Sequence, residues 1–472
     1  MISLTFFGAA GEVTGSCYRI HHATTEGSGS FLVDCGQFQG GRETYRRNLA
    51  ALDFDCRTLD FVLLTHAHLD HSGLLPRLAA LGFRGPIYAT RATIDLAKIM
   101  LLDAAHIQEK EAEWQNRHFR SRHVRRGWDQ APLYTVAQAQ ACLKQFLPVD
   151  YERAFSPQAG VRVCFRDAGH ILGSAILEIW IRESAARETK LVVSGDLGQP
   201  ARPLLPDPSA IVEADHLLIE STYGNRLHRS LAATENELVD ILARTLPRGN
   251  VLIPAFAVGR TQTLIAVLAQ LVRDNRIDRM DVYVDSPMAA AATTLTLEHE
   301  ALLDAETRDL LAWQRHHSER VRMRFTESVE ESMSLNRLKS GAIIISASGM
   351  CDAGRIRHHL RHNLPRRECA VVISGFQAAG TLGRRLVDGA REVTMFGERF
   401  PVRASIHTLG GLSAHADQAA LMGWLRHFRA PPKTTHVVHG ELETARLFAE
   451  RIRHDLTWPQ VSVAERGIEV SL

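Results

Sequence analysis

Four side chains able to bind a metal stand within six positions of one another near residue 70. His66, His68, Asp70 and His71 follow the apolar run Phe61–Leu64, which we expect to be a strand. Imidazole nitrogen and carboxylate oxygen are the expected ligands of catalytic zinc. Because a loop at a strand end can direct alternate side chains at two neighbouring ions, this cluster predicts a metal centre. A histidine-rich surface loop is the alternative interpretation.

Three later positions each place a ligand-type side chain beside a glycine, just past an apolar run: His170, Asp196 and His439. Taken alone, each of them could be an ordinary turn residue. Taken with the first cluster, they give a set large enough to fill the coordination shells of two zinc ions. Asp34 also ends an apolar run, and we interpret it as a carboxylate that orients a ligand histidine or its loop.

The elements that must position these side chains change in pattern along the chain. Up to about Arg226, short apolar runs bounded by Gly, Pro or Asp indicate a layered sandwich of sheets and helices. Strand, loop and helix then alternate strictly, as in a parallel doubly wound sheet, and short strands return from about Glu392. We therefore predict one domain made of residues 1–226 and 392–472, with residues 227–391 inserted as a second domain.

The clearest of these elements can be given bounds from hydrophobic periodicity and the residues that flank it. The expected strands include Val161–Asp167, Val251–Pro254, Ala342–Ser346 and Cys369–Ser374. The expected helices include Arg260–Asn275, Pro287–Thr296, Gln418–Phe428 and Glu443–Asp455.

Composition favours a cytoplasmic globular protein of more than one domain. The chain has 472 residues, is 45% hydrophobic and carries a net charge of only +2, so a nucleic-acid site needs local clustering of charge. No run of eighteen apolar residues exists and the first residues lack the pattern of a signal peptide, so we expect no membrane association. The seven cysteines are scattered without a CxxC pair, which argues against disulfides and against a cysteine zinc site.

The metal motif and the single ligands that follow it resemble the metallo-β-lactamase superfamily. More narrowly, Glu220–Gly224, Ser413–Asp417 and His439–Glu441 resemble three additional motifs of the β-CASP nucleases, which include the polyadenylation endonuclease and its bacterial and archaeal relatives. Pro254–Gln262 and Ser346–Met350 resemble loops of the inserted β-CASP domain. The resemblance covers nearly the whole chain. It implies an α/β fold, in which a metallo-β-lactamase αββα sandwich carries an inserted β-CASP domain with a doubly wound parallel sheet.

The resemblance also implies a division of labour among the candidate residues. Two Zn²⁺ ions would be held by His66, His68 and His170 on one side, by Asp70, His71 and His439 on the other, and by Asp196 as the bridge between them. Glu220 and His415 would belong to the active site without binding metal directly. The family members that act on DNA lack a histidine at the position of His439, so its presence favours RNA.

The resemblance therefore implies a zinc-dependent ribonuclease that acts in RNA processing or decay. The enzyme would be an endonuclease, and it could also have exonuclease activity. The reaction we expect is hydrolysis of RNA phosphodiester bonds by a hydroxide activated by two metals. Asp70, Asp196, Glu220 and His415 are the residues that we assign to catalysis, with His415 protonating the leaving oxygen under the influence of Glu220. Single-stranded RNA is the expected substrate, and a homodimer is a possible assembly.

Phosphate contacts are expected from turns that lead into helices, where backbone N–H groups favour anions. Ser348 and Gly349 form one such turn, Arg260 opens a helix after a strand, and Ser413 lies close to another helix start. Each of these could equally be an ordinary tight turn.

A basic run from Arg117 to Arg126 contains Arg122, Arg125 and Arg126 and no acidic residue. It could bind the RNA backbone, or it could be a solvated basic face.

Two other functions fit parts of the sequence. A hydrolase of small thioesters or lactams could use the same metal core, but a small substrate does not need the inserted domain with a long cationic cleft. A non-catalytic RNA-binding subunit would not need a complete set of metal ligands.

Overall fold

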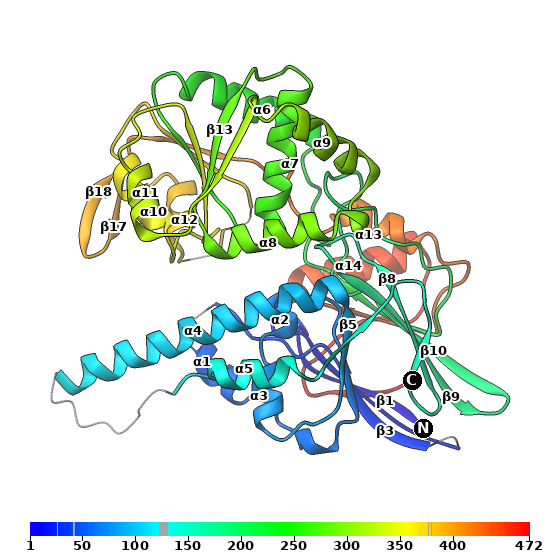
Figure 1. The fold of residues 1–472 in the computed structure, drawn as a ribbon. Helices are drawn as coiled ribbons and strands as arrows, with labels where there is room; N and C mark the ends of the chain where they lie inside the picture. The colour runs from blue at the N-terminus through cyan, green and yellow to red at the C-terminus, as the bar shows by residue number, and fades with distance from the viewer. Residues whose placement is uncertain (26, 41–42, 122–130, 376, 379) are drawn as a thin grey trace. The chain divides into compact units, whose positions relative to one another are not determined.

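The computed structural model describes residues 1–472 except 26, 41–42, 122–130, 376 and 379. Contacts divide the chain into two compact units, whose helices and strands are labelled in Figure 1. The first unit consists of Met1–Pro200, Asp207–Leu227 and His415–Leu472. The second unit consists of Ala201–Pro206 and His228–Ala414.

The first unit is built on two seven-stranded sheets. One has the order β22 (Glu469–Ser471), β1 (Ile2–Gly8), β2 (Cys17–Thr24), β3 (Gly27–Val33), β4 (Phe61–Leu63), β5 (Ile87–Thr90) and β6 (Phe146–Val149). The other has the order β21 (Val461–Val463), β20 (Thr434–Val438), β11 (His216–Glu220), β10 (Arg187–Val193), β9 (Ala175–Ser184), β8 (Val161–Asp167) and β7 (Phe155–Gln158).

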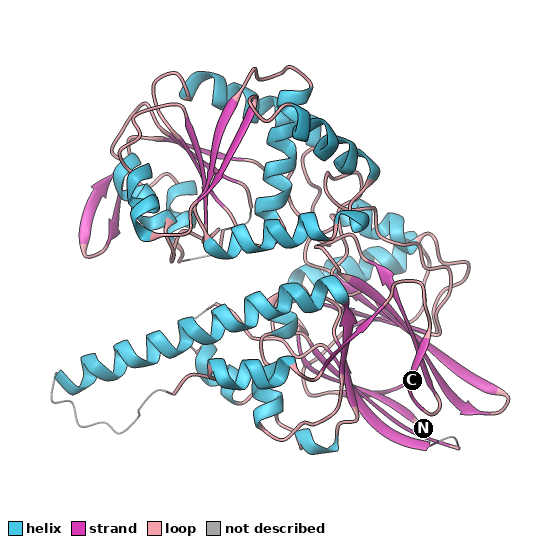
Figure 2. Cartoon of the chain, in the orientation of Figure 1, coloured by secondary structure: helices cyan, strands magenta, loops and turns pink. Residues whose placement is uncertain are grey.

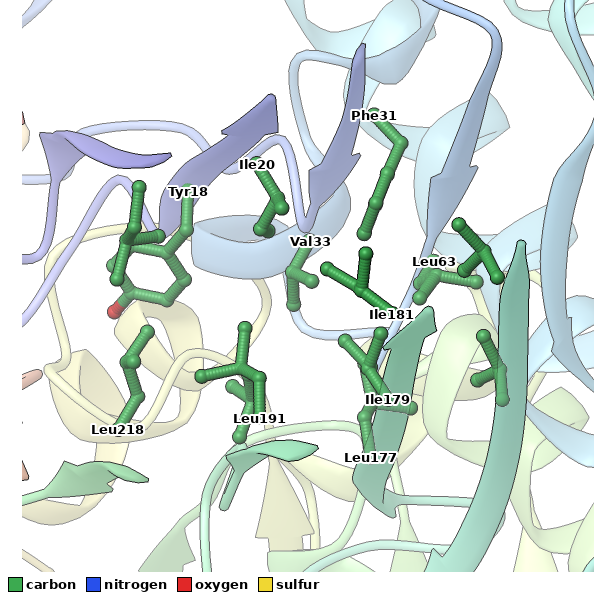
Figure 3. Close-up of a cluster of buried hydrophobic side chains, with 14 of the residues drawn as sticks. Tyr18, Ile20, Phe31, Val33, Leu63, Leu177, Ile179, Ile181, Leu191 and Leu218 are labelled. Atoms are coloured by element: carbon green, nitrogen blue, oxygen red, sulfur yellow. The ribbon is translucent and has the colours of Figure 1, made fainter. Parts of the chain in front are cut away.

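The core of this unit lies between its two sheets. Side chains of β2, β3 and β4, including Phe31 and Leu63, face side chains of β9 and β10, including Leu177, Ile179 and Leu191 (Figure 3). Each fully buried aliphatic or aromatic side chain contributes about 1.5–3 kcal/mol relative to its exposed state. The strands, and with them the loops at their ends, are therefore held in fixed register.

Helices cover the outer faces of the two sheets. The short helices α1 (Thr44–Leu49), α2 (Leu69–Ser72), α3 (Leu75–Ala80) and α5 (Val136–Leu143) accompany the long helix α4 (Arg91–Ser121), which contacts β5 and β6. Helices α13 (Gln418–Leu425) and α14 (Leu442–Asp455) pack on the second sheet through Leu421 and Phe448. This is the predicted αββα sandwich (Figure 2). Among the described residues, no helix combines the length and the apolar character needed to span a membrane.

The second unit contains a six-stranded sheet in which every strand pair is parallel. Its order is β14 (Val321–Phe325), β13 (Met280–Val284), β15 (Ala342–Ser346), β12 (Val251–Pro254), β16 (Ala370–Ile373) and β19 (Ser405–Thr408). Its helices are α6 (Leu231–Thr245), α7 (Arg260–Arg273), α8 (Pro287–Glu298), α9 (Ala305–His316), α10 (Val329–Leu335), α11 (Ile356–Asn363) and α12 (Leu382–Val387).

Both faces of this sheet are covered, as the predicted doubly wound arrangement requires. On β12, Val251 and Ile253 pack with α6 and α7, whereas Leu252 packs with α11 and α12. Alternate residues of a strand point to opposite faces, so a strand buried on both sides reads as an uninterrupted apolar run. This explains why Val251–Pro254 was visible in the sequence.

The contact boundary of the second unit differs from the predicted domain boundary at residue 391. The strand β19 pairs in parallel with β16 and so extends the sheet of the second unit. This unit therefore continues to Ala414. The sequence of β19, Ser-Ile-His-Thr, is short and largely polar because it forms an edge of the sheet, and it carries no strong strand signal.

Candidate metal centre

Every strand that supplies a candidate residue of this centre does so at its carboxyl end. The strands β8, β10, β11 and β20 run in one direction within their sheet, so their carboxyl ends meet at one edge. In the other sheet β3 and β4 are likewise parallel. The segments at these ends bring together residues far apart in the sequence: His66, His68, Asp70, His71, His170, Asp196, Glu220 and His439.

The first ligand group comprises His66, His68, His170 and Asp196. The His68 Nδ1 atom lies 3.2 Å from His66 Nε2 and 3.3 Å from His170 Nε2. Asp196 Oδ2 lies 3.5 Å from His66 Nε2 and 3.6 Å from His170 Nε2. Ligands about 2.0–2.1 Å from a tetrahedral zinc ion lie roughly 3.3 Å from one another. The spacing of these four atoms therefore fits a single zinc ion.

The second ligand group comprises Asp70, His71 and His439, with Asp196 as its neighbour. The Nε2 atoms of His71 and His439 are 3.0 Å apart, and His439 Nε2 is 3.7 Å from Asp70 Oδ2. Asp196 Oδ1 lies 3.4 Å from His71 Nε2. Asp196 thus directs one carboxylate oxygen at each group, which is the arrangement of a bridging ligand.

Burial favours the metal-binding protonation states in the first ligand group. Burial is the main cause that lowers the pKa of His66 and His170 well below the usual value and that of His68 to about 4. Burial alone would raise the pKa of Asp196, but His439 and the neighbouring imidazoles lower it well below its usual range. Neutral imidazoles and an ionised carboxylate are the forms that ligate zinc.

The carboxylates of this centre stabilise positive charge on the groups that lie between them. Burial alone would lower the pKa of His71, but Asp196 and Asp34 raise it well above its usual value. Burial opposes ionisation of Asp70 as well, yet its histidine neighbours hold its pKa at about 2. A divalent cation satisfies the same electrostatic demand, so the charges and the ligand spacing both fit metal ions.

Asp34 is fully enclosed behind the ligands and holds two of the loop residues. Its carboxylate accepts hydrogen bonds from the Thr65 backbone N–H at 2.8 Å and from the Thr65 hydroxyl at 2.9 Å. Its Oδ2 atom lies 2.7 Å from Nδ1 of His71. This contact leaves Nε2 of His71 facing His439 and Asp196. The role of Asp34 in orienting a metal ligand stays a prediction.

Glu220 and His415 stand beside Asp196. Glu220 Oε1 accepts the backbone N–H of Leu197 at 2.7 Å, and Oε2 accepts that of Thr222 at 3.2 Å, so the carboxylate is fixed from both sides. His415 Nδ1 lies 3.4 Å from Glu220 Oε1 and 3.8 Å from Asp196 Oδ2. Burial alone would lower the pKa of His415, but Glu220 and Asp196 raise it to about 9.

Two threonines support the centre although the sequence did not single them out. The Thr65 hydroxyl lies 3.1 Å from Nδ1 of His66, and the Thr222 hydroxyl lies 3.1 Å from Nδ1 of His439. Thr65 directly precedes the metal motif, and this adjacency is a signal that could have identified it. Thr222 stands in the Glu220–Gly224 motif, but its contact with a histidine 217 positions away requires the fold.

The predicted phosphate-binding residues of the second unit lie at the carboxyl edge of its parallel sheet. Arg260 begins α7 after β12, and its guanidinium donates to the Ser374 carbonyl oxygen beyond β16. Ser348 and Gly349 follow β15, where a side chain at position 349 would lie only 3.2 Å from the ring of Phe256. These loops therefore share one edge of the sheet, the usual ligand side of such folds.

Ser413 follows β19, the neighbouring edge strand, and is partly buried. The contacts of all these residues with phosphate stay predictions. Arg122, Arg125 and Arg126 lie outside the residues that the structure describes.

Comparison with known proteins gives three family models that match in succession along the chain. The metallo-beta-lactamase superfamily model matches residues 10–91, and the Beta-Casp domain model matches residues 261–386. A model described as the Zn-dependent metallo-hydrolase RNA specificity domain matches residues 399–470. The description of this last model names zinc and RNA, and the residues that it matches include His415 and His439.

Curated relatives match over nearly the whole chain. The chain is similar to ribonuclease TTHA0252 of Thermus thermophilus, with 38% identity over 93% of both proteins. It is also similar to the transcription termination factor FttA of Methanocaldococcus jannaschii, with 30% identity over 96% of this chain and 69% of that protein. The FttA of Methanothermobacter thermautotrophicus is 31% identical over 93% of this chain and 67% of that protein.

Proposed function

The chain belongs to the β-CASP ribonuclease family of the metallo-β-lactamase superfamily, and from this premise we propose that it hydrolyses phosphodiester bonds in single-stranded RNA with two zinc ions. The observation that carries the proposal is the position of Asp196. Its two carboxylate oxygens lie 3.4–3.6 Å from imidazole nitrogens of two separate ligand groups. Cytoplasmic location and a homodimer stay predictions from the sequence.

The assignment of ligands follows the two groups. One zinc ion would be held by His66, His68 and His170, the other by Asp70, His71 and His439, and Asp196 would contact both. When bound, the two ions supply Lewis-acid chemistry, which makes water nucleophilic near neutral pH and offsets charge on the phosphoryl oxygens.

His439 adopts a left-handed backbone with φ of 49°, and its N–H donates to the Ala9 carbonyl oxygen at 2.7 Å. Such a strained backbone persists only where the surroundings hold it, and it is common at functional sites.

The leaving 3′ oxygen of the ribose needs a proton, and His415 is the residue that we assign to supply it. Two backbone N–H groups fix Glu220, which leaves Oε1 facing His415 Nδ1. A carboxylate in this place stabilises the protonated imidazole and sets the orientation of its ring. Departure of the 3′ oxygen leaves a 5′-phosphate on the product.

The experiment that tests this function is a digest of total RNA with the purified chain, followed by sequencing of the product ends. We expect cleavage of RNA with 5′-phosphate ends and little cleavage of DNA of the same sequence. Hydrolysis of a small thioester without any cleavage of RNA would instead identify a small-molecule hydrolase. RNA binding without hydrolysis of either substrate would identify a non-catalytic subunit.

Replacing Asp34 with alanine should weaken zinc binding by about 10–100-fold, since partners that orient metal ligands typically contribute that much. The change leaves His71 and Thr65 without the carboxylate that holds them. Competition with a chromophoric zinc chelator measures the affinity, and circular dichroism checks the fold. Asp60→Ala is the control, because Asp60 also accepts a backbone N–H, at 2.8 Å, but precedes β4. An Asp34→Ala protein with normal zinc affinity would refute the orienting role.

A further inference from the structure

A hairpin in the second unit, formed by β17 (Glu392–Met395) and β18 (Glu398–Pro401), lies beside α11 and α12 (Figure 1). Its inward side chains Val393 and Met395 are fully buried in a cluster with Leu360 of α11 and Leu386 of α12. The hairpin is therefore anchored to the unit. Its outward face and its tip remain exposed.

The tip of this hairpin carries a phenylalanine where the backbone disfavours one. Met395 pairs with Glu398, so Phe396 and Gly397 form a two-residue turn, with φ angles of 53° and 80°. A turn with two positive φ angles favours Asn, Asp or Gly at its first position, and a bulky residue there is strained. Strained residues of this kind cluster at functional sites.

Phe396 is 41% exposed, and an imidazole and a guanidinium from α11 lie close to its ring. His358 stacks on it with ring centroids 4.7 Å apart and an interplanar angle of 30°. The guanidinium carbon of Arg357 lies 4.5 Å from the ring centroid. We name this group of Phe396, Arg357 and His358 the hairpin cluster. It combines an exposed aromatic ring with a cation, the pair of features that single-stranded nucleic acids use for base stacking and backbone contact.

The charge around the hairpin cluster is positive and only partly neutralised. The stretch from residue 355 to residue 403 contains ten arginines and four acidic residues. Five of the ten arginines pair with carboxylates in the described part of the chain: Arg355 with Asp285, Arg361 with Glu398, Arg366 with Glu368, Arg384 with Asp388 and Arg399 with Glu392. Among the described residues, no carboxylate pairs with Arg357 or with the two arginines at the hairpin base, Arg391 and Arg403. This surface is therefore better suited to bind a polyanion than to bind a protein whose acidic and basic residues balance.

We propose that the hairpin cluster is a second RNA-binding surface of this chain, one that binds single-stranded RNA. A base stacks on the exposed ring of Phe396, and Arg357 contacts the adjoining phosphate. The inference rests on the proposed function, because RNA is the polyanion that we propose the metal centre cleaves. The cluster itself is built only from residues of α11 and the hairpin, so it can fail while the ribonuclease function stands.

The test uses Phe396→Asn, because asparagine fits the left-handed turn position that phenylalanine occupies under strain. The variant should melt no lower than the parent protein. Its affinity for unstructured oligouridine should fall roughly 5- to 150-fold, the effect of losing one base–aromatic stack. Binding is measured by fluorescence anisotropy with full-length protein in an Asp196→Ala background, so that the RNA is not cut. Phe396→Trp keeps an aromatic ring at the tip and should bind RNA as tightly as the parent protein. Arg357→Ala should reduce the salt dependence of binding.

Phe325→Ala is the matched control, since Phe325 is 39% exposed and ends β14 in the same unit. It should bind RNA as the parent does. If the wild-type protein cleaves RNA and Phe396→Asn keeps the parent RNA affinity, the RNA-binding role of the hairpin cluster is overturned. The proposed ribonuclease function then stands. Equal losses in Phe325→Ala and Phe396→Asn would overturn the RNA-binding role too, by showing a nonspecific effect. A wild-type protein that neither binds nor cleaves RNA would overturn the proposed function, and the hairpin cluster with it.

Discussion

The variant Asp196→Ala should lose RNA cleavage almost completely while its circular dichroism spectrum stays that of the folded protein. Asp196 is 2% exposed, and its oxygens face His66 and His170 on one side and His71 on the other. Removing one group that stabilises charge in a transition state typically costs about 10²–10³-fold in rate. Asp196 is shared by both ligand groups, so we expect a loss at or above the upper end of that range.

The rate is measured as initial cleavage of a labelled single-stranded RNA at saturating zinc. Asp150→Ala is the control, because Asp150 is a surface aspartate of the same unit whose side chain is 70% exposed. It should keep the parent rate. Retained activity in Asp196→Ala would mean that another residue bridges the two ligand groups.

The second large effect is expected for His415→Ala, and it depends on the leaving group of the substrate. General acid catalysis typically contributes about 10²–10⁴-fold, so RNA cleavage should fall by that factor. Zinc content and RNA affinity should remain close to those of the parent, because His415 belongs to neither of the two predicted ligand groups. A phosphodiester of p-nitrophenol should recover much of the lost rate, since p-nitrophenolate leaves without protonation.

His427→Ala is the control for this experiment, because His427 is exposed and closely follows α13 in the same unit. Loss of zinc in His415→Ala would identify His415 as a metal ligand. An equal loss of rate on both substrates would exclude proton donation and favour a role in positioning the phosphate.

The layered architecture was predictable because buried strands leave a strong pattern in the sequence. The predicted bounds of Val161–Asp167, Val251–Pro254 and Ala342–Ser346 equal those of β8, β12 and β15. The strands β12 and β15 are almost wholly apolar, and β8 has apolar residues at Val161, Val163, Cys164 and Phe165, as expected of strands packed on one or both faces. The edge strand β19 lacks this signal, because one of its sides needs no partner and its residues are half exposed.

The metal-binding residues were predictable for a different reason, which is that chemistry restricts the residue types. Histidine and aspartate past strand ends can be read directly, and the structure brings all seven candidates into two groups. Their roles as ligands stay predictions. The supporting contacts of Thr65 and Thr222 could not be predicted, because they depend on side chains that meet only after the sheets have assembled.

The long helix α4 and the hairpin cluster show the limit of the sequence more clearly. Helix α4 begins at Arg91 directly after β5, where the Thr90 hydroxyl accepts the N–H of Thr93 at 3.2 Å, and its polar residues are spread along its length. The arginines around the hairpin are visible in the sequence, but only the structure separates those paired with carboxylates from Arg357, which contacts an aromatic ring. Charge alone does not reveal which cations are already neutralised.

The central claim is that this chain cuts RNA with two zinc ions held by the two ligand groups. The most direct test removes the metal by dialysis against a chelator and returns zinc in measured steps, with the rate of RNA cleavage recorded at each step. We predict that the metal-free protein is inactive and that activity rises until two equivalents of zinc per chain are bound, one for each ligand group. Full activity at one equivalent, or no cleavage of RNA at any zinc loading, would contradict the account.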